Sequence, residues 1–179
     1  KVQINFTRRP EISFLPGYRY QKEIFSEITV KKDIVYGKAK GYWTNSPYSD
    51  DPYIEVLGKG LVKTFRDQQP LDLKLDLYYP EDDTLSNAPL VMLIHGGAFY
   101  VGSKDAVTEK TLATTLAKRG YVVASINYRL GFKPLPKDLE MSGYRAIQDA
   151  HAALRYLSHY SKDLRINPSQ IYVGGTSAG

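Results

Sequence analysis

The stretch that decides the fold is residues 171–179, with the sequence IYVGGTSAG. Three residues suited to a strand are followed at once by the pattern G-x-S-x-G over 175–179. This order predicts a tight strand-to-helix turn that holds the hydroxyl of Ser177 clear of the sheet. Small neighbours suit such a turn because larger side chains find no room, and strained backbone is expected there. Ser177 is therefore a candidate nucleophile.

A second glycine-rich turn, 95–99 (HGGAF), follows the apolar run 90–94 (LVMLI). Its two glycines and Ala98 leave backbone N–H groups uncovered, as binding of a developing oxyanion requires. A Gly-Gly pair alone would be an ordinary turn, but two such turns after buried strands support each other. The residues expected to support the turns are His95, Gly96, Gly175 and Gly179. Phe99 and Tyr100 either line a substrate pocket or pack in the core, and the sequence leaves both alternatives open.

The strand pattern predicts an α/β fold with a mostly parallel sheet. Leucines alternate with polar residues over 71–79, which indicates a strand with one buried face, and residues 61–65 are its expected hairpin partner. Asp72 and Asp76 are expected to face solvent. The runs without alternation are typical of parallel strands covered on both faces, namely 90–94, 121–126 and 171–173.

Two helices are expected between these strands. The first covers 106–119, with Asp105 as its N-cap and Gly120 as its stop, and the second covers 139–161. Strands and helices then alternate, as in a parallel sheet that follows an antiparallel N-terminal hairpin. Further expectations on the second helix are an apolar face that includes Ile147, a surface ion pair between Arg145 and Asp149, and packed or solvated roles for His151 and His159.

Composition restricts the class of protein. The chain has 179 residues, of which 42% are hydrophobic and 24% charged, so one globular domain or part of one is expected. The net charge of +5 is scattered and forms no basic block, which argues against nucleic-acid binding. Without cysteine, disulfides and thiol nucleophiles are excluded. No apolar run approaches the ~18 residues of a membrane span. The start at Lys1 rather than Met indicates either an expressed segment or a mature form whose leader has been removed, and with the absence of cysteine and the Tyr-rich lead-in it is compatible with a secreted or periplasmic protein, with the cytoplasm left open.

Four segments together resemble the α/β-hydrolase fold, in its carboxylesterase and hormone-sensitive-lipase-like branch. They are 95–99 (HGGAF), 127–130 (NYRL), 146–150 (AIQDA) and 174–179 (GGTSAG), in the family's order. The resemblance covers about residues 60–179. We expect 1–58 to be a Tyr- and Pro-rich lead-in or cap with one short strand, and 59–179 to be the N-terminal half of the catalytic domain.

The resemblance implies ester hydrolysis through an acyl-enzyme, without cofactor or metal. Ser177 would be the nucleophile, and the N–H groups of Gly97, Ala98 and Ala178 would form the oxyanion hole. The family usually has a third glycine where this chain has Ala98. The substrate would be a small-molecule or polysaccharide-linked ester. Acetyl or feruloyl esterase, formamidase, lipase and peptidase are not separated, and a non-catalytic binding or adhesion module is the alternative.

The triad of such enzymes continues with an Asp or Glu and then a His after the serine. The three histidines of this chain all precede Ser177. In addition, the strand at 171–173 should be central in the family's sheet, and it would leave an open edge here. The sequence therefore predicts a fragment, whose remaining half follows residue 179 or belongs to a second chain.

Overall fold

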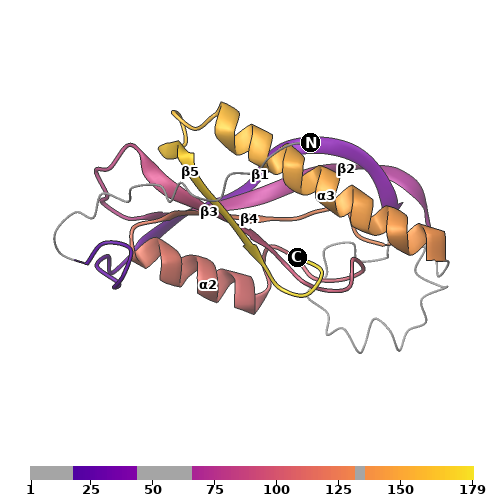
Figure 1. Ribbon diagram of the computed structural model, residues 1–179, viewed down its shortest axis with the longest axis horizontal. Coiled ribbons are helices and arrows are strands. Elements are labelled where there is room, and N and C mark those ends of the chain that lie inside the picture. The colour runs from indigo at the N-terminus through magenta and orange to yellow at the C-terminus, as the bar shows by residue number, and fades with distance from the viewer. Residues whose placement is uncertain (1–17, 44–65, 132–135) are drawn as a thin grey trace, which may run out of the picture.

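The computed structural model describes residues 18–43, 66–131 and 136–179 (Figure 1). Within these ranges the chain forms a five-stranded sheet of order β1-β2-β4-β3-β5. The strands are β1 (Ile28–Trp43), β2 (Arg66–Pro80), β3 (Ala88–Ile94), β4 (Val122–Ile126) and β5 (Ile166–Gly175). The helices are α2 (Val107–Lys118) and α3 (Pro136–His159). The predicted alternation of strands and helices is confirmed.

The sheet changes from antiparallel to parallel, as predicted. β2 pairs antiparallel with β1 and β4, whereas β3 pairs parallel with β4 and β5. The partner of β2 is the long strand β1, and the expected partner at 61–65 lies outside the described residues. The expectation of one short strand in the lead-in was wrong. Register shifts between Lys31 and Ile34 and between Val35 and Gly37 interrupt the period of two, which hides this strand in the sequence.

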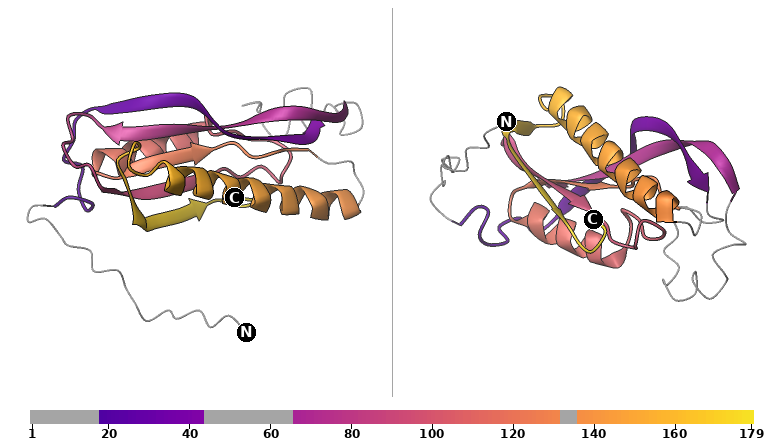
Figure 2. Two further views of the ribbon diagram at one scale, coloured as in Figure 1. Left: turned by 90° about the horizontal axis from the view of Figure 1, so that it is seen from above. Right: turned by 45° about the vertical axis from the view of Figure 1, so that its right-hand side comes forward.

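The two helices cover opposite faces of the sheet, as Figures 1 and 2 show. Alternate side chains of a strand point to opposite faces, so β2 contributes to two separate cores. On one face, Leu75 and Leu77 pack with Ala153 and Leu157 of α3. On the other face, Tyr78 packs with two small residues of α2, Ala113 and Ala117. In the described ranges no helix is long and apolar enough to cross a membrane.

Covering both faces explains why Asp76 does not face solvent. Asp76 lies on the α2 side of β2 and is 0% exposed, with Lys104 as its ion-pair partner at 2.9 Å. Asp72, nearer the start of β2, is exposed as predicted. The alternation of leucines correctly gave one buried face, but it carried no information about what covers the other face.

The helix limits differ from the prediction at their ends. Ala106 occupies the N-cap of α2, without a side-chain cap, and Asp105 instead binds the Lys104 ammonium at 2.7 Å. Gly120 ends the helix as predicted, with φ 101° and an N–H bond to the Ala117 carbonyl. In α3, Ile147 is 59% exposed and does not belong to the buried face. The buried apolar residues of that helix are Ala146, Ala153 and Leu157.

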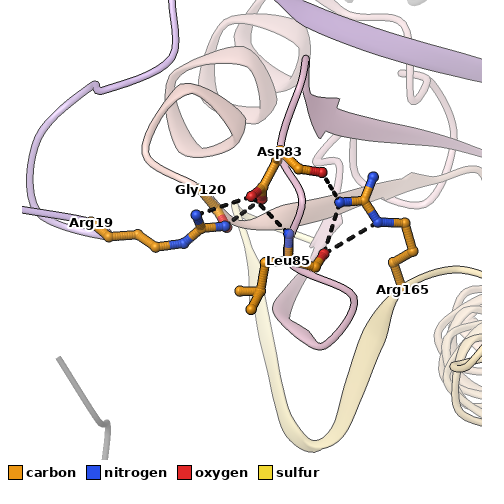
Figure 3. A network of polar contacts seen from close by, with 5 residues as sticks. All are labelled: Arg19, Asp83, Leu85, Gly120 and Arg165. Carbon is orange, nitrogen blue, oxygen red and sulfur yellow. Dashed lines mark hydrogen bonds and ion pairs between the residues drawn. The ribbon is translucent and has the colours of Figure 1, made fainter. Parts of the chain in front are cut away.

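A polar network joins Arg19 to the three segments that precede β3, β4 and β5 (Figure 3). Arg19 binds the carboxylate of Asp83 and the Gly120 carbonyl, and Arg165 binds the carbonyls of Asp83 and Leu85. Arg19 and Asp83 are both largely buried. Because a buried charge is costly without a partner, this network fixes the segment before β1 against the loops of the sheet.

A buried tyrosine provides the first testable prediction. The Tyr79 hydroxyl is buried and has no hydrogen-bond partner among the described residues. Burial raises the pKa of Tyr79 to about 12, although the charge of Arg165 opposes the shift. Above pH ~10 the tyrosine of the unfolded chain loses its proton, while Tyr79 in the folded protein keeps it up to about pH 12. The folded state therefore loses stability as pH rises from ~10 towards about 12, and is unaffected by this group below pH ~10.

We therefore expect Tyr79→Phe to be neutral or stabilising by up to about 1 kcal/mol at pH 7, because an unpaired polar group leaves the core. It should also reduce the alkaline loss of stability. Urea unfolding at pH 7, 9 and 11 measures both effects. The control is Tyr36→Phe, since the Tyr36 hydroxyl donates to the Asn127 carbonyl at 2.5 Å. Greater destabilisation by Tyr79→Phe than by Tyr36→Phe would contradict the prediction.

Candidate active site

The turn after β5 has the strained backbone that the G-x-S-x-G pattern predicts. Ser177 is exposed and has φ 55°, in the left-handed region that non-glycine residues seldom adopt. The Gly179 N–H closes the turn by donating to the Thr176 carbonyl at 2.8 Å. A Cβ on Gly179 would lie 2.1 Å from the Ile94 carbonyl oxygen, and one on Gly175 would lie 2.5 Å from the Gly179 carbonyl carbon. Both glycines are thus required by close backbone packing.

The loop after β3 is a tight coil. Gly97, Ala98 and Phe99 have φ values of 123°, 52° and 60°, three successive residues with positive φ. The N–H groups of Tyr100 and Val101 both donate to the Gly97 carbonyl, at 2.9 and 3.0 Å. A Cβ on Gly97 would lie 2.0 Å from the Val101 carbonyl oxygen. Glycine is therefore needed at Gly97, both for its φ and for space.

The two turns lie together at the carboxyl ends of the parallel strands β3 and β5. β3 and β5 are neighbours, with Ile94 opposite Gly175, so the turns that follow them emerge side by side (Figure 1). A Cβ on Gly96 would lie 3.3 Å from the Ser177 Cβ and 2.9 Å from the Thr176 carbonyl oxygen. Gly96 and Thr176, 80 positions apart in sequence, thus approach so closely that a side chain at position 96 would not fit.

Several backbone donors remain available at this junction. In the part of the chain that the structure describes, no group accepts a hydrogen bond from the N–H of Gly97, Ala98 or Ala178. All three residues are partly exposed. Backbone N–H groups without an acceptor can bind negative charge on a reacting oxygen, so the oxyanion role of these three residues stays a prediction.

His95 supports the loop from below. Its ring is buried, stacks on the Tyr128 ring at a centroid distance of 4.4 Å, and places Nδ1 2.7 Å from the Gly96 carbonyl oxygen. The Tyr128 hydroxyl donates to the His95 carbonyl at 2.8 Å. Burial raises the pKa of Tyr128, so the hydroxyl keeps its proton. Tyr128 was not singled out from the sequence, although it lies within the segment NYRL.

The other predicted site residues lie as follows. Tyr100 is buried, which is the core-packing alternative, while Phe99 is partly buried against Leu130 and Ala146. A pocket role for Phe99 stays a prediction. His151 and His159 are exposed on α3. Among the described residues, no three His, Cys, Asp or Glu side chains gather in a way that could hold a metal ion.

Asp149 pairs with a residue that the sequence did not suggest. Its carboxylate is 3% exposed and binds the Arg129 guanidinium at 2.7 Å and the Arg129 backbone N–H at 2.8 Å. The prediction of a surface ion pair between Arg145 and Asp149 was therefore wrong, because Asp149 is buried and pairs with Arg129. The observed pair joins α3 to the loop after β4, in which the Gly131 N–H donates to the Phe99 carbonyl. It thereby supports the loop that carries Gly97.

Asp149→Asn should cost about 3–5 kcal/mol of unfolding free energy, because Arg129 would keep a largely buried charge without its partner. Urea denaturation measures this loss. The matched control is Asp72→Asn, which breaks an exposed ion pair between Lys38 and Asp72 at 3.2 Å. We expect the control to change stability by less than about 1 kcal/mol. Equal losses in the two variants would contradict the structural role given to Asp149.

The mixed sheet with a helix on each face is that of an α/β-hydrolase. Esterase B of Lactobacillus rhamnosis superimposes with a TM-score of 0.56 at 26% identity, over 89% of this chain and 38% of that chain. A propionate-bound thermophilic esterase of Thermogutta terrifontis superimposes with a TM-score of 0.51 at 26% identity, over 61% of this chain and 38% of that chain. The family model BD-FAE matches residues 75–179, and the chain belongs to this family.

The sequence comparison also finds similarity to esterases. A carboxylic ester hydrolase of the bumblebee Bombus ignitus is 32% identical over 111 residues, which are 60% of this chain. The chain spans only 19% of the length of that relative and 38% of the length of esterase B.

Proposed function

We propose that the protein is a serine hydrolase of carboxylic esters, with Ser177 as nucleophile. The observation that carries the proposal is the exposed Ser177 at φ 55°, close to residues 95–101 (the glycine loop), in which the N–H groups of Gly97 and Ala98 have no acceptor among the described residues. Membership of the BD-FAE family and similarity to two esterases support it further.

The chemistry has two steps. In the first, the Ser177 oxygen attacks the ester carbonyl while a base takes the hydroxyl proton, and the alcohol leaves with that proton as the C–O bond breaks. In the second, water cleaves the acyl-enzyme and releases the carboxylic acid. The N–H groups of Gly97, Ala98 and Ala178 stabilise the oxyanion in both steps. The base is a His oriented by an Asp or Glu, both encoded beyond residue 179.

A fluorophosphonate probe tests the nucleophile directly. The full-length gene product should be labelled covalently on Ser177, as shown by mass spectrometry of the adduct, and Ser177→Ala should not be labelled. Ser169→Ala is the matched control, because Ser169 is exposed near the opposite end of β5. Equal labelling of wild type and Ser177→Ala would remove Ser177 from the mechanism. No labelling at all would favour the alternative of a binding or adhesion module.

The length of the acyl group that the enzyme prefers can be tested with a panel of substrates. The propionate bound to the Thermogutta terrifontis esterase is the acid of a short acyl ester. We propose that this protein also prefers short acyl groups. Comparing short acyl esters, long acyl esters and acetylated xylan tests this preference and separates an esterase from a lipase or a polysaccharide esterase. Faster hydrolysis of long acyl esters would contradict the preference for short ones.

A further inference from the structure

The loop that follows β3 leaves the sheet at Ile94 and is bound to it again ten residues later, at Lys104. The Lys104 side chain is 3% exposed, and its Nζ lies 2.9 Å from a carboxylate oxygen of Asp76 in β2. The same ammonium lies 2.7 Å from Asp105 and 3.3 Å from Asp33. Burial alone would lower the pKa of Lys104, but its hydrogen bonds to Asp105 and Asp76 and their charges raise it. The buried ammonium therefore keeps its charge at neutral pH.

The main chain of Lys104 is held as well. Its N–H donates to the Asn127 side-chain oxygen at 2.6 Å, and its carbonyl accepts from the Ser125 hydroxyl at 3.0 Å. Ser125 lies in β4, and Asn127 follows that strand. Lys104 is thus bound to two neighbouring strands through buried polar groups. Such an anchor is expected to be rigid, because breaking it would leave charges and polar atoms unpaired in the core.

The anchor is coupled to the glycine loop by close backbone contacts. Gly102, two residues before Lys104, has φ 95°, and a Cβ on it would lie 2.4 Å from the Gly96 carbonyl oxygen. The Val101 N–H is bonded to the Gly97 carbonyl at 3.0 Å. Residues 101 and 102 therefore pack directly on Gly96 and Gly97. A displacement of Lys104 would be passed to these residues over a very short length of chain.

We propose that Lys104 is a positioning residue for the oxyanion donors. Its buried ion pair with Asp76 holds the loop 95–105 so that the N–H groups of Gly97 and Ala98 face the oxygen that becomes negative when Ser177 attacks. The inference rests on the proposed ester hydrolysis. Hydrogen-bond donors that stabilise a transition state must be placed within a fraction of an ångström, so a loosened anchor lowers turnover without removing any group that touches the substrate.

Three variants of the full-length gene product separate positioning from stability. Lys104→Met removes the ammonium and leaves the Asp76 carboxylate buried without its ion-pair partner, while the main-chain hydrogen bonds of residue 104 stay possible. The double variant Asp76→Asn/Lys104→Met removes both charges of the pair, so most of the stability should return while the ion pair stays absent. Arg19→Met is the matched control, because it breaks another largely buried ion pair, with Asp83 (Figure 3), at the amino ends of the parallel strands and thus away from the glycine loop.

Turnover is the first readout. We expect kcat for a short acyl ester to fall about 10- to 100-fold in both Lys104 variants, with KM changed less than about threefold. Arg19→Met should lower the midpoint of thermal unfolding and change kcat less than about twofold, because its ion pair is far from the glycine loop. Full recovery of kcat in the double variant would show that Lys104 acts only on stability and would overturn the proposal.

Amide hydrogen exchange is the second readout and does not depend on catalysis. Peptides that cover 96–102 should exchange faster in both Lys104 variants than in wild type and in Arg19→Met. Unchanged exchange in these peptides would overturn the positioning role, whatever the activity. If Ser177→Ala hydrolysed the ester at the wild-type rate, the proposed function would be overturned instead. The hydrogen-exchange measurement would still decide the role of Lys104. The two failures are thus distinguishable.

Discussion

Ser177→Ala should lower kcat for ester hydrolysis by about 10⁴-fold or more, because removing the nucleophile of a serine hydrolase leaves only binding and the oxyanion donors to assist water. The side chain is exposed and its loss opens no cavity. Alanine at φ 55° is about as strained as serine, so the unfolding free energy should change by less than about 0.5 kcal/mol. Steady-state kinetics and urea unfolding measure the two quantities.

The expected pattern is a large loss of turnover with unchanged stability. Ser169→Ala should retain wild-type turnover. Residual hydrolysis by Ser177→Ala above a hundredth of the wild-type rate would indicate a different nucleophile or an activated water. A large loss of stability would mean that Ser177 has a structural role in the turn, in contrast to its exposure.

Gly97→Ala should have the second largest effect. Alanine rarely adopts φ 123°, and its Cβ would lie 2.0 Å from the Val101 carbonyl oxygen, so the coil 97–101 must open. The strain should cost about 1–3 kcal/mol of stability. Because this change would displace the N–H group that we propose as an oxyanion donor, we expect kcat to fall about 10²- to 10³-fold, as for loss of one such donor.

Gly143→Ala is the matched control for this substitution. Gly143 lies within α3, and a Cβ on it would meet Phe99 at 3.8 Å, an ordinary contact. We expect this variant to be more stable by up to about 1 kcal/mol, since alanine is the better helix former, and to keep its kcat. Wild-type turnover in Gly97→Ala would show that the glycine loop does not supply an oxyanion donor. Urea unfolding and steady-state kinetics measure both variants.

Much of the fold was predictable because its signals are local. The runs 90–94 and 121–126 differ from the alternating 71–79, and this difference correctly separated the parallel strands from the antiparallel one. β1 was underestimated because its bulges break the period of two. Asp76 was misplaced because alternation along one strand does not reveal what covers its other face.

The sequence by itself determined which groups are present for chemistry: a serine in a G-x-S-x-G turn and small residues that leave N–H groups uncovered after another strand. Only the tertiary structure decided that Gly96 lies close to Ser177, that Lys104 pairs with Asp76, and that Asp149 pairs with Arg129. The physical reason is the distance along the chain over which each interaction acts. Turn chemistry and hydrophobic period act over a few residues and can be read along the chain, whereas the partner of a buried charge depends on strand order and register, which bring distant residues together.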